Sequence, residues 1–356
     1  MIVCGSALGG LPRDTMRRTF DKSELMPHSE PRQGFADQLR KRPKAAPRKR
    51  GANAAAPVSS ASTSPELPAN CSAGDAFRLI ARALLQTIAA QQLAVRQSDP
   101  TGVHQMRIAL RRMRAAIAIF GPMVDDRESR RLRAELKWLA GRLAPARDLH
   151  LLELKFTTAQ LGGASPLFLK RLGHDRGAAF TRAKTTVEQP RFRRLLRDLR
   201  HWIDGDSWSK AAGAAAERPA KGFARHVLGH RARKLVKHCD RLDEIDDDAR
   251  HQVRIRAKKL YYATGFFESL FAGHSSGKQV ARFKKQLKKL LDALGALNDI
   301  AVHRELTGKF AGRAKAKLDH EAAAQLSDLD TAEIRRQIKA AMKAAGKLAD
   351  RPLFGD

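Results

Sequence analysis

The stretch 103-VHQMRIALRRMR-114 decides the fold, because it combines the periodicity of a helix with a high density of positive charge. Its apolar residues recur at the spacing of one buried helical face. At 100° per residue, His104, Arg107, Arg111 and Arg114 fall within an arc of about 80° on the adjoining face. Like charges at this spacing repel one another by about 0.2–0.5 kcal/mol per pair. A polyanion bound along this face would offset that repulsion.

The pattern returns later in the chain as 250-RHQVRIRAKKLYY-262. A shift of 147 residues pairs His104 with His251, Arg107 with Arg254, Arg111 with Lys258 and Arg112 with Lys259. Such an internal repeat predicts two helical halves related by pseudo-symmetry. Symmetry about an axis brings equivalent helices toward each other, so we expect His104 and His251 to approach one another across the pseudo-axis and clamp the ligand.

A second match, shifted by 151 residues, follows a small gap. It pairs Arg131 with Arg282 and ends with Asp148 on Asp299. We expect each aspartate to open a helix as its N-cap. The second copy also carries another basic stripe, formed by Lys278, Arg282, Lys285 and Lys289.

Composition favours helices and a polyanionic partner. The chain has 356 residues, of which 43% are hydrophobic and only 6% aromatic, with Ala, Leu, Arg and Lys prominent. Lys and Arg number 68 against 37 Asp and Glu, so the formal charge is +31 and the pI about 10.9. Such a balance indicates binding to nucleic acid, an acidic membrane surface or a polymer of phosphate. Most of the excess charge follows residue 70, so it belongs to the folded body.

Neither a disulfide framework nor a metal site is predicted. Cys4, Cys71 and Cys239 are far apart, with no CxxC spacing and no paired histidine ligands. No run approaches 18 apolar residues, and the start MIVCGSALGGLP lacks the basic region of a signal peptide. We therefore expect a soluble cytoplasmic protein without a cofactor or bound metal and without contact with a membrane.

The chain divides by composition. Residues 1–71, rich in Pro, Ala, Ser and Arg and including 40-RKRPKAAPRKR-50, are predicted to form a disordered basic tail. Residues 72–350 are predicted to form the folded domain, with repeats over 72–204 and 223–350 joined by a linker over 205–222. Periodicity predicts an all-α protein built from helical bundles. The expected helices cover 75–95, 100–120, 125–143, 147 onward, 165–188, 190–203, 223–242, 247–271, 278–295, 298–310, 314–326 and 328–349.

Four pieces of the sequence, in order, resemble the CHAD family, the conserved-histidine α-helical domains. They are 103-VHQMRIALRRMR-114, 142-RLAPARDLHLL-152, 251-HQVRIRAKKLYYA-263 and 294-LGALNDIAVH-303. The resemblance implies two pseudo-symmetric four-helix bundles that bind inorganic polyphosphate along a basic surface and a central channel. It also implies association with polyphosphate granules. His150 and Tyr261 depart from the family pattern, in which a second Asp and a basic residue are common.

The candidate polyphosphate-binding residues combine the repeated basic positions with those that the resemblance implies. They are His104, Arg107, Arg111, Arg112, Arg114, Arg131, His251, Arg254, Lys258, Lys259, Lys278, Arg282, Lys285 and Lys289. Arginine gives bidentate contacts to phosphate, lysine gives adaptable point charges, and a nearby phosphate should raise the pKa of a histidine.

The main alternative function is nucleic-acid binding, which the charge permits. Only three Trp and two Tyr are present for stacking on bases, and no known DNA- or RNA-binding motif occurs. An enzyme is a second alternative, but no matching carboxylates, glycine-rich phosphate loop or CYTH-type ExExK strand accompanies the histidines. A helical scaffold is the third. We therefore expect a stand-alone binder without catalytic residues; other polyanionic partners and a homodimer stay open.

Overall fold

The computed structural model describes residues 64–157, 166–311 and 318–349, and within these ranges the fold is all-α, as predicted. Its helices are α1 (Ala73–Ala90), α2 (Gln92–Arg96), α3 (Pro100–Ile119), α4 (Gly121–Val124), α5 (Arg127–Thr157), α6 (Pro166–Glu188), α7 (Pro190–Asp204), α8 (Ser207–Ala212), α9 (Ala214–Glu217), α10 (Ala220–Cys239), α11 (Asp247–Phe267), η1 (Glu268–Phe271), α12 (His274–Ala311) and α13 (Leu318–Ala349). An antiparallel bridge joins Ser72 to Pro219 outside the helices.

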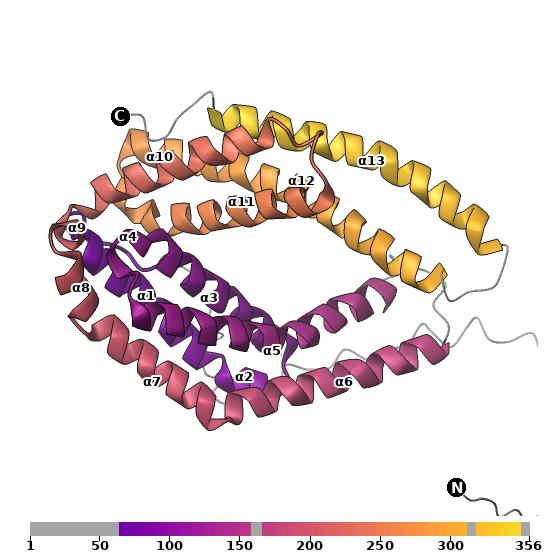
Figure 1. Ribbon diagram of the computed structural model, residues 1–356, viewed down its shortest axis with the longest axis horizontal. Helices are drawn as coiled ribbons and strands as arrows, with labels where there is room; N and C mark the ends of the chain where they lie inside the picture. The colour runs from indigo at the N-terminus through magenta and orange to yellow at the C-terminus, as the bar shows by residue number, and fades with distance from the viewer. Residues whose placement is uncertain (1–63, 158–165, 312–317, 350–356) are drawn as a thin grey trace, which may run out of the picture. The chain divides into compact units, whose positions relative to one another are not determined.

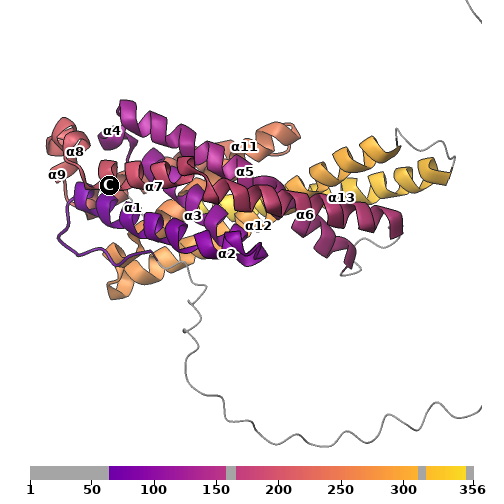
Figure 2. The same ribbon diagram turned by 90° about the horizontal axis from the view of Figure 1, so that it is seen from below.

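The helices form two bundles with matching order. In the second repeat, α10, α11, α12 and α13 pack in a closed ring, each against the next and α13 against α10. In the first repeat, α1, α3 and α5 take the places of α10, α11 and α12, and α6 with α7 together take the place of α13. Figure 1 shows α5 beside α6 in one half and α12 beside α13 in the other, and Figure 2 shows the same pairs from below.

The central helices α3 and α11 begin alike. Asp99 caps α3 by accepting from the N–H groups of Thr101 and Gly102, and Asp246 caps α11 by accepting from the N–H of Ala249 at 2.7 Å. Asp99 and Asp246 are also 147 residues apart, so the repeat extends to the caps. The histidine and the basic residues that follow it therefore lie at the same number of residues from the N-cap in both helices.

Two helices predicted as separate are continuous. The segments 125–143 and 147 onward form the single helix α5, which runs through Pro145. Buried Leu143 and Ala146 flank the exposed proline, so core packing carries the helix across it. The segments 278–295 and 298–310 likewise lie in α12. The helices predicted over 314–326 and 328–349 form the single helix α13 from Leu318 on, and residues 314–317 lie outside the described residues. The prediction that Asp148 and Asp299 are N-caps is therefore wrong, because both lie inside long helices.

The segment predicted as a linker over 205–222 is folded. It contains α8 and α9, and Trp208 is almost fully buried. The indole Nε1 of Trp208 donates to the carbonyl of Trp202 at 3.0 Å, and its ring lies 5.1 Å from that of Phe77. Aromatic packing orders a segment whose own apolar periodicity is weak.

Part of the predicted tail also belongs to the folded unit. Leu67 and Cys71 are buried, and the N–H of Leu67 donates to the hydroxyl of Ser269 at 3.0 Å. The folded unit therefore begins before residue 72, where the sequence predicts the end of the tail. Composition does not reveal this, because only a few apolar residues of a Pro- and Ser-rich stretch make the contacts. The remainder of the predicted tail lies outside the described residues.

An aromatic core joins the two bundles. Phe120, at the end of α3, contacts Phe77 of α1 and stacks on Phe223 of α10, with ring centroids 5.3 and 5.0 Å apart. It also lies 5.6 Å from Phe267 of α11. The two bundles thus share one core at the C-terminal ends of α3 and α11, which holds these helices together. In the described part of the chain, no helix is long and apolar enough to cross a membrane.

Candidate functional site

The first half of the site lies on α3 and α5. Nη1 of Arg107 donates to the carbonyl of Ala140 at 3.0 Å, and its Nη2 lies 3.9 Å from the carboxylate of Asp148. Burial, followed by the charges of Arg147, Arg111 and Arg107, lowers the pKa of His104. Four basic side chains from two helices therefore share a partly buried volume with a single described carboxylate beside it.

The second half repeats this arrangement on α11 and α12. Arg254 packs against Gly295, where an added Cβ would lie 3.7 Å from its Nη2. Burial lowers the pKa of Arg254 and the charge of Asp299 opposes that effect, as Asp148 does for Arg107. Nδ1 of His251 donates to Oδ1 of Asn298 at 2.6 Å, because the amide oxygen only accepts.

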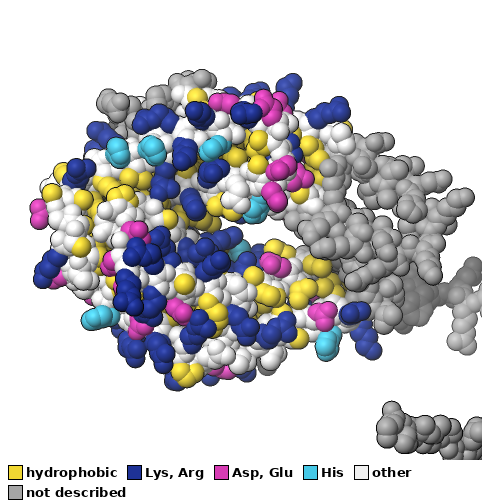
Figure 3. Space-filling view, viewed as in Figure 1, with side chains coloured by type: hydrophobic (Ala, Val, Ile, Leu, Met, Phe, Trp, Pro, Cys, Tyr) yellow, Lys and Arg dark blue, Asp and Glu magenta, His cyan; other side chains and the backbone are white. Residues whose placement is uncertain are grey.

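The two halves converge on Arg111. Helix α3, which carries Arg111, packs on α11 across the boundary between the repeats, and the charge of Arg111 lowers the pKa values of Arg254 and Lys258 on that helix. Burial, then Arg254 and Arg111, lower the pKa of Lys258 to about 8, with Asp299 acting in the opposite direction. We call the residues His104, Arg107, Arg111, Arg147, Arg254 and Lys258 the α3–α11 cluster. Figure 3 shows Lys and Arg side chains on both walls of the hollow between the bundles.

The charges of the α3–α11 cluster are only partly compensated within the protein. Burial lowers the pKa values of Arg107, Arg147 and Arg254, so their charged forms lack part of the hydration that they would have in water. Among the described residues, the buried Nε atoms of Arg111 and Arg254 have no hydrogen-bond partner. An oxyanion between the helices would supply acceptors and negative charge together.

The two histidines do not form a pair. His104 has its charged neighbours in its own repeat, and His251 bonds to Asn298 of its own repeat. Within the described part of the chain, no hydrogen bond or ring contact joins the two imidazoles. The charges that act between the repeats are those of Arg111, Arg254 and Lys258. The structure therefore gives no support to the expected clamp of His104 and His251.

Two predicted site residues lie elsewhere, in ordinary structural contacts. Arg112 is buried, donates to the hydroxyl of Ser64 at 2.6 Å and stands over the ring of Phe266 at 5.3 Å. Arg131 lies on the surface, where it bonds to Glu128 and to Asp198, and these bonds raise its pKa.

The remaining predicted residues are exposed in two other places. Arg114 and Lys259 come together, since Arg114 contributes to lowering the pKa of Lys259. The basic stripe of α12, formed by Lys278, Arg282, Lys285 and Lys289, is exposed. By helical geometry that stripe lies roughly 100° around α12 from Gly295. Lys284, on the Gly295 side, stands instead over the ring of Tyr261 at 6.0 Å.

Sequence reasoning missed Arg147, Asp148, Asn298 and Asp299 as members of the site. The signal was present, because the repeat aligns Arg147-Asp148 with Asn298-Asp299. An aspartate at the start of an expected helix predicts an N-cap, and this prediction hides its proximity to an arginine. In both halves the aspartate of this pair lies beside an arginine, Asp148 beside Arg107 and Asp299 beside Arg254.

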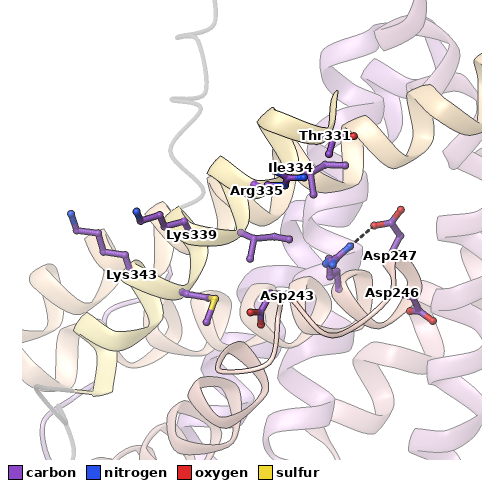
Figure 4. Close-up of a pocket in the computed structure, with 11 residues that line it drawn as sticks. Asp243, Asp246, Asp247, Thr331, Ile334, Arg335, Lys339 and Lys343 are labelled. Carbon is purple, nitrogen blue, oxygen red and sulfur yellow. Dashed lines mark hydrogen bonds and ion pairs between the residues drawn. The ribbon is translucent and has the colours of Figure 1, made fainter. Parts of the chain in front are cut away.

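A separate pocket of about 1000 Å³ lies between α13 and the connection from α10 to α11. Figure 4 shows Asp243, Asp246 and Asp247 on one side and Arg335, Lys339 and Lys343 on α13. Its charged lining is mixed, because Arg250 also lies there and pairs with Asp247 at 2.9 Å. The carboxylates at this pocket partly offset its cations, which distinguishes it from the α3–α11 cluster.

Fold and site together define a class of all-α proteins. Its members consist of two pseudo-equivalent helical bundles, with a basic helix from each bundle at their boundary. The family model of the CHAD domain matches residues 79–308, and the chain belongs to this family. The crystal structure of the CHAD domain from the plant Ricinus communis is similar over 82% of this chain and 96% of that chain, with 24% identity and a TM-score of 0.65. PptA from Streptomyces chartreusis is similar over 79% of this chain and 100% of that chain, with 18% identity and a TM-score of 0.54. Comparison with curated proteins gave no match.

Proposed function

We propose that this protein binds inorganic polyphosphate in the α3–α11 cluster without hydrolysing it. The observation that carries the proposal is that α3 and α11 pack together across the two repeats and bring to their boundary the buried Nε atoms of Arg111 and Arg254, which have no partner among the described residues. Membership of the CHAD family supports the same ligand class. Each of these cations costs free energy in the unbound protein, and a phosphate polymer offsets that cost at several positions at once.

Polyphosphate fits this chemistry better than nucleic acid does. Sequence-tolerant binding of single strands relies on exposed aromatic rings that stack on bases. Among the described residues, the exposed large hydrophobic side chains are leucines, namely Leu93, Leu151, Leu154 and Leu169. A linear phosphate polymer has no bases and needs only charge and N–H donors, which the cluster supplies.

The acidic residues of the site also have a place in this proposal. Asp148 and Asp299 lie beside Arg107 and Arg254, one in each repeat. They partly offset the repulsion in the unbound protein, and they leave a net positive charge for the ligand. Because binding would attach the protein to a polymer, we also propose that it associates with polyphosphate granules in the cytoplasm.

A competition assay tests the proposal on the full chain. A labelled long-chain polyphosphate is displaced by unlabelled polyphosphate, duplex DNA or single-stranded DNA at matched phosphate concentration and about 150 mM salt. We expect polyphosphate to compete best and no phosphate to be released. Stronger competition by DNA would overturn the choice of ligand, and release of phosphate would overturn the absence of hydrolysis.

A matched pair of variants assigns the binding to the cluster. The cluster variant combines Arg111→Gln, Arg254→Gln and Lys258→Gln. The α7 control combines Arg193→Gln, Arg194→Gln and Arg200→Gln, which removes three exposed charges that form no ion pair with described residues. We expect a loss of polyphosphate affinity of roughly 100-fold in the cluster variant and little change in the control. Equal losses would mean that net charge alone drives binding.

A further inference from the structure

A second group of cations lies on α10 and α11, outside the α3–α11 cluster. Burial, then Arg231, Arg114 and Arg256, lower the pKa of Lys259. Burial, then Arg256, Lys234 and Lys237, lower the pKa of His238. The α10–α11 surface is defined as Arg114, Arg231, Lys234, Lys237, His238, Arg256 and Lys259. Figure 3 shows Lys, Arg and His side chains side by side over α10.

In the described structure, no carboxylate forms an ion pair with the α10–α11 surface. Among the described residues, none of its members forms an ion pair, whereas Arg107 has Asp148 and Arg131 has two carboxylates. Only Arg231 is held by a strong contact, since its Nη2 donates to the carbonyl of Ala118 at 2.8 Å. The Nε2 atom of His238 is buried without a hydrogen-bond partner in the described structure. The uncompensated charge calls for an external anion.

The α10–α11 surface adjoins the α3–α11 cluster through two helices. On α3, Arg114 follows Arg111 by one turn, about 4.5 Å along the axis. On α11, Lys259 directly follows Lys258 and points about 100° further around the helix. A flexible chain of phosphates that leaves Arg111 and Lys258 therefore meets the next cations within one turn.

We propose that the α10–α11 surface is a second phosphate-binding segment, which receives the same polyphosphate chain as it leaves the α3–α11 cluster. This inference rests on the proposed function and adds a preference for chain length. Tripolyphosphate is short and engages the cluster alone. A long chain engages both segments, and the second contact is intramolecular once the first has formed.

The test uses the full chain and two ligands, tripolyphosphate and long-chain polyphosphate. The surface variant combines Lys234→Gln, Lys237→Gln and Arg256→Gln, all exposed residues outside the α3–α11 cluster. We expect it to bind long chains roughly tenfold more weakly, because three charge contacts of modest strength are lost. Its affinity for tripolyphosphate should change less than about twofold. The α7 control should match the unaltered protein with both ligands.

Several results would overturn the inference while leaving the proposed function intact. One is an unchanged affinity of the surface variant for long chains, with the cluster variant still impaired. Another is an equal loss for both ligands, which would mean that the surface acts through general charge. A third comes from duplex DNA measured as an additional ligand: a loss confined to DNA binding would assign the surface to nucleic acid. If the unaltered protein bound neither phosphate ligand, the proposed function itself would fail.

Discussion

Arg111 lies near enough to Lys258 to lower the pKa of that lysine, and the two residues occupy the same position in the two copies of the repeat. A position close to a two-fold axis meets its own equivalent across the axis. A basic residue placed there is therefore opposed by another basic residue from the second copy. Duplication thus converts one cationic helix face into a site with charge on both sides.

Replacing Arg111 by glutamine should reduce the charge repulsion in the unbound protein and also weaken polyphosphate binding. Without the neighbouring guanidinium, the pKa of Lys258 should move back toward its ordinary value of 10.5. We expect the unbound protein to melt at a higher temperature and to bind polyphosphate about 5–30-fold more weakly. Calorimetry and NMR titration of lysine side chains measure the three effects. A lower melting temperature would mean that Arg111 contributes more through packing than it costs through repulsion.

Lys258 should make polyphosphate binding sensitive to alkaline pH. Its pKa in the unbound protein is about 8, and bound phosphate must raise that value because it favours the ammonium form. Binding therefore takes up a proton, and affinity should fall as the pH rises from about 7 to 9.5. The stability of the unbound protein changes in the opposite direction. The pKa of Lys258 is lower in the folded protein than in the unfolded chain, so the free energy of unfolding increases as the pH rises from about 8 toward 10.5.

The variant Lys258→Arg provides the control for this pH dependence. An arginine keeps its charge throughout the range, so affinity should decline less steeply than in the unaltered protein. Titrations at several pH values and constant salt give the slopes. Identical slopes would show that a different group takes up the proton.

His104 should add a dependence at acidic pH. Burial, Arg147, Arg111 and Arg107 hold its pKa below 6.5, so the imidazole is mostly neutral at neutral pH in the unbound protein. Phosphate favours the charged ring, so affinity should rise as the pH falls from about 7.5 to 5.5, and His104→Ala should weaken that rise. The unbound protein behaves in the opposite way. Its stability is complete above pH 6.5 and decreases as the pH falls through the lowered pKa of His104.

The sequence predicts the helical class, the repeat and the residues at its centre, because these follow from local periodicity and from a direct match of Arg107 and Arg111 to Arg254 and Lys258. Arg112 and its equivalent in the repeat lie in different surroundings for a physical reason. Its position matches that of Lys259, which is exposed, whereas Arg112 faces Phe266 and Ser64. Pseudo-equivalent positions differ when the segments that pack over them differ, and periodicity within one helix carries no information about those segments.

The continuity of the long helices is a second feature that the local sequence does not predict. Pro145 predicts a break, yet packing of Leu143 and Ala146 keeps α5 intact. That continuity fixes Asp148 opposite Arg107. Placement of the acidic residues therefore depends on tertiary packing, which overrides the local preference of proline.

Replacing Asp148 by asparagine should strengthen polyphosphate binding. Arg107 keeps its bond to the carbonyl of Ala140, so its guanidinium stays in place when the carboxylate is lost. One negative charge fewer beside the ligand should raise affinity about 2–5-fold at moderate salt, and less at high salt. The matched control is Asp243→Asn, which removes an exposed carboxylate at the separate pocket. A loss of affinity specific to Asp148→Asn would assign this residue to orienting Arg107.

Arg112 should matter for stability and not for binding. Its guanidinium bonds to Ser64 and stands over Phe266, within the shared core of the two bundles. We expect Arg112→Ala to lower the free energy of unfolding by about 1–3 kcal/mol, through the lost packing, hydrogen bond and cation–π contact. The affinity of the folded variant for polyphosphate should stay within about twofold of the original. Denaturant unfolding and calorimetric titration below the melting temperature test both parts. A large loss of affinity in a variant of normal stability would return Arg112 to the binding site, and the buried face of α3 would then have to open when the polymer binds.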